Sequence, residues 1–247
     1  GASLNVIPLL DNGELDMNEF NNLLSESTKL VAVSHISNAL GTISPIEEII
    51  SKAHKIGAKV LIDGAQAASH IALDMQKLDA DFYCFSAHKM FGPTGVGVLY
   101  GKEEILNKLP PYQGGGEMIK EVSFEKTTSA CLPHKFEAGT PNISGVIAFK
   151  QAIDFITELG VETIAKYEDE LLQYATAEVL KIEGLKIYGT AAHKSGIISF
   201  NIDGLHPYDI GMIVDKMGVA IRTGHHCTQP IMDRFNIPGT ARISLSV

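Results

Sequence analysis

The chain has 247 residues, 45% of them hydrophobic, and a formal net charge of −9 from 20 Lys and Arg against 29 Asp and Glu. A chain of this length and apolar content can bury a sizeable core, as one large domain or two modest ones. The negative charge and the lack of a long Lys/Arg run argue against a nucleic-acid partner. No stretch reaches the roughly 18 uninterrupted apolar residues of a membrane span, so no membrane partner is expected either.

The first half of the chain alternates short apolar runs with a helical pattern. Residues 30–35 and 59–64 read as buried strands, and the helix between them opens with Ser44 as N-cap and Pro45 as N1 and closes at Gly57. Together they predict a βαβ unit. Strands are also expected at 81–86 and 95–100, on either side of the loop AHKMFGPT, and the glycines and prolines of residues 108–142 favour ordered loops or hairpins.

The second half begins with two amphipathic helices, at 146–160 and 161–182. A strand at 196–202, a helix at 207–218 and strands at 219–222 and 241–247 follow. This order predicts an α/β fold: a large domain over residues 1–157, with a mainly parallel sheet and helices on both faces, and a smaller α+β domain over residues 158–247. Both ends of the chain are abrupt and strand-like, so we expect a fragment that lacks an N-terminal part and the C-terminal end.

The three cysteines bear on where the protein works. Cys84, Cys131 and Cys227 are odd in number, widely spaced and without a CxxC pair, which disfavours a disulfide framework and a thiolate metal site. This usage fits a reducing compartment. Since the N-terminus also has no basic region before its apolar residues, we expect an unexported, cytoplasmic protein.

Polar side chains gather at the carboxyl ends of predicted strands, where open α/β sheets bind ligands. Asp63 ends the second strand; alone, it would most simply cap the next helix. Lys89 follows the third strand, and alone it would be a solvated surface lysine, but a His and a glycine-rich turn beside it could desolvate its amine. A pyridoxal-phosphate enzyme needs both an amine for the aldehyde and a carboxylate for the pyridine nitrogen. Ser86 and His88 add donors for a phosphate, and Gln66 could reach the phenolic oxygen.

A second group is the segment RTGHHC, from Arg222 to Cys227. Three interpretations compete for it: a buried structural cysteine beside two hydrogen-bonded histidines, a metal site, and a reactive thiol. The metal site is the weakest, because three consecutive residues cannot easily point at one ion. A reactive thiolate would be favoured by Arg222 and the two histidines. The residues alone leave the structural cysteine and the reactive thiol open.

Several segments together resemble one family. In order and spacing, the chain resembles the group II cysteine desulfurases of the SUF iron–sulfur assembly system in VSHISNALGTISPI, LIDGAQAASH, DFYCFSAHKMFGPTGVGVLYG, GGGEMI, FEAGTPN and RTGHHCTQP. The resemblance covers nearly the whole chain. It implies the fold of the fold-type I, class V aminotransferase-like proteins, with pyridoxal 5′-phosphate as cofactor and L-cysteine as substrate.

The resemblance also implies a role for each matching residue. Lys89 would hold the cofactor as a Schiff base and Cys227 would accept sulfur as a persulfide, leaving L-alanine. Asn38 and Gln66 would contact the cofactor or the substrate, and Asp63 would contact the pyridine nitrogen. Ser86 and His88 would bind the phosphate, Arg222 the substrate, and Arg242 the substrate carboxylate. Thr140 would reach the cofactor phosphate of a neighbouring subunit, which implies a homodimer, and a SUF acceptor protein would take the sulfur.

Three alternatives stay open at this point. A selenocysteine lyase acting on L-selenocysteine would share the whole site. Another class V enzyme would share Asp63, Gln66, His88 and Lys89 without requiring Cys227. A catalytically silent scaffold would need neither reactive group, and the intact Lys89 and Cys227 argue against it.

Overall fold

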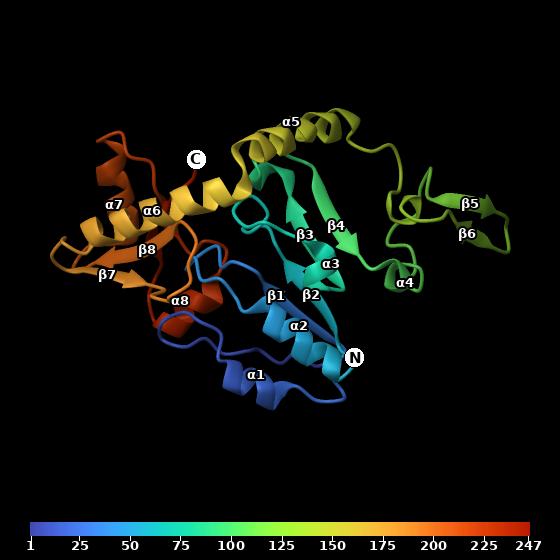
Figure 1. Ribbon diagram of the computed structural model, residues 1–247, viewed down its shortest axis with the longest axis horizontal. Helices are drawn as coiled ribbons and strands as arrows, with labels where there is room; N and C mark the ends of the chain where they lie inside the picture. Colours follow the sequence, from blue (N-terminus) through green and yellow to red (C-terminus); the bar gives the residue numbers. More distant parts are fainter.

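The computed structural model describes all residues, 1–247, and its first half is built on a four-stranded sheet. The strands lie in the order β1-β2-β3-β4, and they are Leu30–Ser34, Lys59–Asp63, Phe82–Ser86 and Gly97–Gly101. The first three run parallel and β4 runs antiparallel to β3. The predicted, mainly parallel sheet is therefore confirmed, and the carboxyl ends of β1, β2 and β3 share one edge (Figure 1).

The βαβ unit forms because its helix has one apolar face. Helix α2 (Ile46–Lys55) buries Ile46, Ile49, Ile50 and Ala53, at the predicted spacing, against Val60 and Ile62 of β2. The predicted Ser44 cap is wrong: Pro45 is the N-cap and no side chain bonds the first turn, while the backbone N–H of Ser44 donates to the carbonyl of His35.

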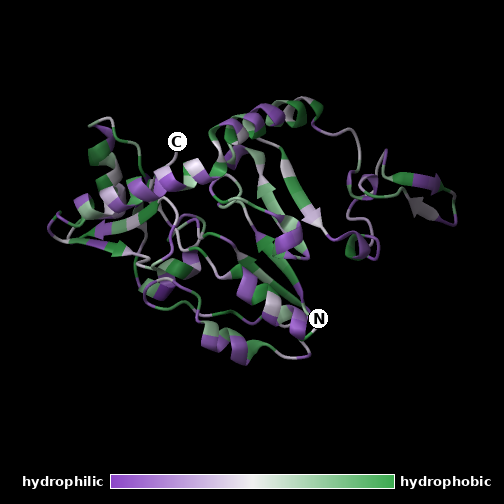
Figure 2. Cartoon of the chain, in the orientation of Figure 1, coloured by the Kyte–Doolittle hydropathy of each residue, from purple (hydrophilic) through white to green (hydrophobic).

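Two apolar clusters cover the sheet. One contains α2 and Phe20 of helix α1 (Met17–Leu23), and the other contains Phe149 and Ile156 of helix α5 (Ile143–Leu159) and Ile164 of helix α6 (Val161–Val179). The strands β1, β2 and β3 are mostly green in Figure 2, whereas α1 and α6 carry hydrophilic purple. The sequence did not predict α1 or the short helices α3 (Met75–Leu78), α4 (Glu103–Leu106) and α8 (Gln229–Phe235).

The second half contains an antiparallel sheet in the order β7-β8-β10-β9. Its strands are Leu185–Tyr188, Ile197–Ile202, Thr240–Ser244 and Arg222–Gly224, and α6 and α7 (Pro207–Asp215) pack on it. The strand predicted at 219–222 is wrong in its bounds, because pairing with β10 begins only at Arg222. The domain division predicted between residues 157 and 158 falls inside the last turn of α5, and it stays a prediction.

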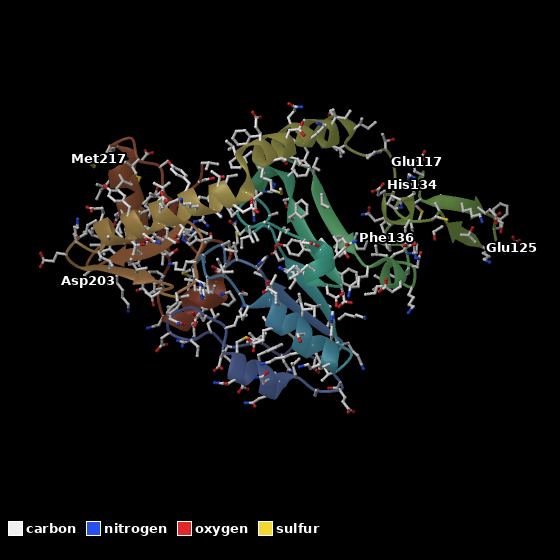
Figure 3. The ribbon with its side chains drawn as sticks, in the orientation of Figure 1. Glu117, Glu125, His134, Phe136, Asp203 and Met217 are labelled. Atoms are coloured by element: carbon white, nitrogen blue, oxygen red, sulfur yellow. The ribbon has the colours of Figure 1, made fainter.

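Between β4 and α5 the chain projects away from both sheets. It forms a hairpin of β5 (Ile119–Val122) and β6 (Thr127–Ser129), as the glycines and prolines indicated, and Glu117, Glu125, His134 and Phe136 mark it in Figure 3. The buried Lys135 ties this segment back to α4, since its Nζ donates to the carbonyls of Leu106 and Asn107, at 3.1 and 3.0 Å. No helix combines the length and the apolar character needed to cross a bilayer.

Candidate active site

The turn that carries Lys89 follows directly from β3. Residues Ala87–Lys89 form a short 3-10 turn in which Ala87 and the following Met90 are buried, whereas His88 and Lys89 point outward and are exposed. The hydroxyl of Ser69 donates to the Lys89 carbonyl at 3.1 Å. The backbone of this turn is therefore fixed. The predicted desolvation of the Lys89 amine is wrong for this chain, because burying residues 87 and 90 turns residues 88 and 89 to the outside.

Close packing on the other side of this turn requires a glycine. A Cβ at Gly92 would lie 2.7 Å from Cδ2 of Phe149 and 2.9 Å from the carbonyl oxygen of Ala87. Since the second contact is with backbone, it cannot be relieved by a side-chain rotation. Gly92 thus lets α5 press the Lys89 turn onto the sheet, and this is the role of the glycine-rich segment after Lys89.

The turn after β2 carries Asp63 in a similar way. Its Oδ1 accepts the backbone N–H of Ala65 at 2.9 Å, two residues on, which closes a turn; no helix begins there, so the predicted helix cap is wrong, and the carboxylate is exposed. Gly64 lies directly over the ring of Tyr83, where a Cβ would be 1.9 Å from Cε1. The Tyr83 hydroxyl in turn lies 2.9 Å from Nδ1 of the buried His35. The sequence had given no role to this buried pair, which supports the Asp63 turn from below.

The predicted cofactor residues thus come to one edge of the sheet, with one exception. Asp63 stands beside Cys84 in the register of β2 and β3, and Ser86 and Lys89 follow at the end of β3. Gln66 and Ser86 are half-buried, and neither makes a hydrogen bond through its side chain within the chain. Thr140 lies apart, exposed on the bend between the projecting segment and α5, and its predicted contact with a second subunit stays a prediction.

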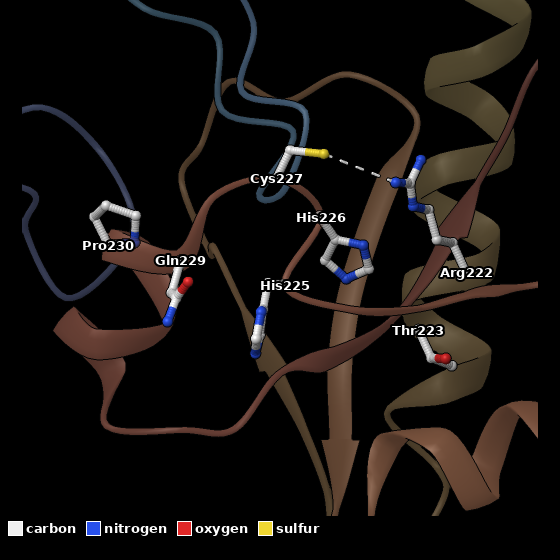
Figure 4. Close-up of a pocket in the computed structure, with 7 residues that line it drawn as sticks. All are labelled: Arg222, Thr223, His225, His226, Cys227, Gln229 and Pro230. Carbon is white, nitrogen blue, oxygen red and sulfur yellow. Dashed lines mark hydrogen bonds between the residues drawn. The ribbon is translucent and has the colours of Figure 1, made fainter.

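The loop that carries Cys227 runs from β9 to α8. Cys227 is exposed, and its Sγ lies 4.0 Å from Nη2 of Arg222, the two side chains pointing toward one another (Figure 4). The thiol opens into a cavity of about 490 Å³ whose lining comes entirely from the segment between Arg222 and Pro230. A buried structural cysteine is therefore ruled out. No cluster of three or more His, Cys, Asp or Glu side chains is arranged to hold a metal ion.

Arg222, which lines this cavity, is paired with a second arginine that does not line it. Arg222 of β9 and Arg242 of β10 are direct partners in the antiparallel register. Like charges placed opposite each other repel. Burial lowers the pKa of Arg242, the Arg222 charge lowers it further, and the guanidinium Nε is buried without a partner. A carboxylate between the two guanidinium groups would relieve the repulsion and accept hydrogen bonds from both.

Asn38 joins the two sheets at this point. It follows β1, at the same sheet edge as Asp63, and its Nδ2 donates to the carbonyl of His226 at 2.6 Å. Its own carbonyl accepts from Nη1 of Arg242, also at 2.6 Å. The structure therefore brings Asn38, Arg222, Arg242 and Cys227 together, and their predicted roles stay predictions.

One histidine of the pair behaves differently from the prediction. His226 is buried, and burial, with Arg242 as the next cause, lowers its pKa to about 4. Its ring is neutral near pH 7 and faces Thr240, at 2.9 Å from Oγ1, so it is not a cationic neighbour of the thiol. The sequence carries no visible signal for the Thr240 contact, because the two residues meet only through the pairing of β9 with β10.

Comparisons with known proteins agree with this arrangement. The family model for class V aminotransferases matches residues 1–247. A cysteine desulfurase of Dickeya dadantii (strain 3937) is 50% identical over 248 residues, which is 100% of this chain and 60% of that protein. One of Enterobacter sp. (strain 638) is 52% identical over 246 residues, covering 99% of this chain and 60% of the relative. The chain thus spans about 60% of the length of these relatives.

A solved structure shows the same fold. The apo structure of a cysteine desulfurase from Thermococcus onnurineus NA1 superposes with a TM-score of 0.94 at 39% identity, covering 98% of this chain and 61% of that one. The fold and the match along the full chain therefore point to the same family. This chain belongs to the class V aminotransferase family.

Proposed function

We propose that the chain is the core of a pyridoxal-phosphate-dependent cysteine desulfurase that converts L-cysteine to L-alanine and takes the sulfur on Cys227 as a persulfide. The observation that carries this proposal is the exposed Cys227 thiol, which lies in a cavity lined by Arg222, the register partner of Arg242. Asn38 links that cavity to the strand ends that hold Asp63 and Lys89. The relatives at about 50% identity carry the name cysteine desulfurase.

The donor set at the sheet edge fits pyridoxal phosphate. Lys89 offers an exposed amine with no partner for its side chain, and Asp63 offers an exposed carboxylate with one free oxygen. Lys89 would bind the aldehyde and Asp63 the pyridine nitrogen, with Ser86 and His88 at the phosphate and Gln66 at the ring oxygen. When bound, the cofactor supplies a sink for the electrons released at the substrate Cα.

The remaining steps belong to side chains of this chain. Arg222 and Arg242 hold the carboxylate of L-cysteine and so fix its orientation, with Asn38 beside them. The Lys89 amine moves the proton at Cα. The Cys227 thiolate attacks the substrate sulfur; the bond between sulfur and Cβ breaks, the S–S bond of a persulfide forms, and the three-carbon skeleton leaves as alanine after protonation.

The wider setting is part of the same proposal. The enzyme works in the cytoplasm as a group II, SUF-type desulfurase, and a SUF acceptor protein removes the sulfur. In a homodimer, Thr140 contacts the cofactor phosphate of the other subunit, which fits its exposure away from its own sheet edge. All three cysteines are free, as a reducing compartment requires. L-Selenocysteine is the alternative substrate, since its carboxylate and amine are the same.

Two cysteine variants of the full-length protein test the proposal. Cys227→Ala should form no persulfide on incubation with L-cysteine, as read by mass spectrometry, while the visible absorbance of bound cofactor stays. Cys131→Ala is the matched control, because Cys131 is the other exposed cysteine and should leave the persulfide unchanged. A normal persulfide yield in Cys227→Ala would overturn the proposal. Comparing turnover of L-cysteine and L-selenocysteine then decides between the two substrates.

A further inference from the structure

The backbone that carries Cys227 is strained. His226 and Cys227 both lie in the left-handed region, with φ of 54° and 61°. A side chain in this region meets its own backbone, so non-glycine residues adopt it singly and at a cost. Two in succession persist only when the surroundings hold them, and such strain collects at functional positions. Gly224, two residues before His226, also has a positive φ, of 114°, but glycine has no Cβ, so the strain lies in the histidine and the cysteine.

The His226 side chain anchors this turn to β10. Its Nε2 lies 3.1 Å from the carbonyl oxygen of Thr240 and 2.9 Å from the Thr240 hydroxyl. Because a carbonyl oxygen only accepts, a neutral ring must carry its proton on Nε2 and donate there. The other ring nitrogen, Nδ1, is buried and has no partner. The two nitrogens therefore differ: Nε2 bonds the turn to the sheet and Nδ1 does not.

The His226 peptide is also held from the opposite side. Its carbonyl accepts from Nδ2 of Asn38 at 2.6 Å, so the peptide is fixed between β10 and the end of β1. The charged and titratable groups around the ring are Arg242, Arg222 and His225, and with burial as the largest cause they keep the imidazole uncharged. A cation at this position would repel both arginines.

From this geometry we propose that His226 is a positioning residue: its neutral ring, donating from Nε2 to Thr240, holds residues 226 and 227 in the left-handed turn and so keeps the Cys227 thiol in the cavity beside Arg222. This inference deepens the proposed desulfurase function and rests on it. The thiol lies near Arg222 only as long as the turn keeps its shape. The donor at Nε2 is the atom required, and Nδ1 is dispensable.

Two amide variants separate the ring nitrogens in the full-length protein. His226→Gln places an amide nitrogen close to the position of Nε2, and His226→Asn places one close to Nδ1. One readout is the alkylation rate of Cys227 by iodoacetamide without substrate, divided by that of Cys131 in the same molecule. We expect this ratio to fall about tenfold in His226→Asn, the size of one lost hydrogen bond to a buried acceptor, and to stay within about threefold of wild type in His226→Gln.

Rescue by the conservative variant gives a second readout that a merely structural role would not move. With the thiol displaced from Arg222, the persulfide yield on incubation with L-cysteine should fall in His226→Asn and return to the wild-type level in His226→Gln. His193→Gln is the control, because His193 is exposed and should change neither readout. If His226→Asn does not fold, as judged by circular dichroism, His226→Leu takes its place, since it fills the buried space without a donor.

The outcomes separate this inference from the proposed function. An alkylation ratio and a persulfide yield equal to wild type in His226→Asn or His226→Leu would overturn the positioning role, as would an equal loss in His226→Gln. Absence of a Cys227 persulfide in the wild-type protein would instead overturn the desulfurase proposal, and the alkylation ratio would still test the positioning role. Persulfide yield in the three variants should follow the alkylation ratio.

Discussion

The sheet edge with Asp63 and Lys89 and the loop with Cys227 are built in opposite ways. At the sheet edge, the backbone is fixed by packing at Gly64 and Gly92, and the reactive side chains are exposed. At the loop, the thiol is exposed but buried side chains hold the strained turn beneath it. The first arrangement fixes the backbone and leaves the side chains open to a ligand, whereas the second fixes the position of a thiol by contacts within the chain.

The difference has a physical reason. Side chains that bind a cofactor at several points can each be left without a partner in the chain, because the cofactor supplies that partner. A thiol that attacks a substrate atom must be held by the protein itself, and holding it costs backbone strain. We therefore expect changes at the sheet edge to act on cofactor binding or on folding, and changes at the loop to act on the thiol.

The largest effect should come from Lys89. Lys89→Ala removes the amine and leaves the turn intact, because the side chain makes no contact that the fold uses and Ala87 and Met90 stay buried. We expect complete loss of the visible absorbance of bound cofactor, with the same thermal unfolding of the apo protein as wild type. Lys55→Ala, at the end of α2, is an exposed control. Cofactor absorbance that survives in Lys89→Ala would mean that the amine is elsewhere.

The next effect tests the packing beneath Asp63. In Gly64→Ala the new Cβ would overlap the Tyr83 ring, which is fully buried and bonded to His35, so the strand end must move. We expect a loss of about 3 kcal/mol in the free energy of unfolding, measured with denaturant. Gly114→Ala, where nothing lies within 4 Å of the added carbon, should change it by less than about 0.5 kcal/mol. Equal stability of the two variants would show that Tyr83 does not support this turn.

The sequence predicted these two regions unequally. The strands, α2 and the residues at the strand ends could be predicted because hydrophobic spacing and chain order determine them locally. Three features could not be predicted, since they depend on how distant segments pack: the exposure of Lys89, the contact of Tyr83 with His35, and the contact of His226 with Thr240. The bounds of β9 failed for the same reason: its pairing with β10, and not local propensity, defines the strand.

A third prediction concerns acid and acts on the loop alone. The folded-state pKa of His226 is about 4, below its ordinary value of 6.5, so between these values the unfolded chain binds the proton and the folded chain does not. Stability from this residue is complete above about pH 6.5 and is lost as the pH falls toward 4. Between pH 8 and pH 5 the loss should be about 2 kcal/mol.

His226→Gln provides the comparison for this acid effect, because glutamine does not titrate and the other acid-sensitive groups remain. Burial also lowers the pKa of His35, so wild type should lose stability through that residue as well. The difference between wild type and variant isolates His226. Denaturant unfolding at pH 8 and pH 5 measures it, and a pH dependence that is identical in the two proteins would contradict a buried, neutral His226.

The smallest effect should come from Asn38, where the two regions meet. Asn38→Ala removes the amide that donates to the His226 carbonyl and keeps the backbone carbonyl that accepts from Arg242. One lost hydrogen bond should lower the free energy of unfolding by about 1 kcal/mol. Since Thr240 still anchors the turn, the alkylation ratio of Cys227 to Cys131 should change less than in His226→Asn.

Asn18→Ala, on the exposed face of α1, is the control for Asn38→Ala. Asn38→Ala also tests whether the end of β1 and the Cys227 loop are coupled. Asn38 is the residue through which the end of β1 contacts the Cys227 loop, so a substrate carboxylate that engages its amide would compete with the loop for it. If the competition exists, adding L-alanine should change the alkylation ratio of the wild type and leave that of Asn38→Ala unchanged. A ratio that responds equally in both proteins would place the link between the two regions at another residue.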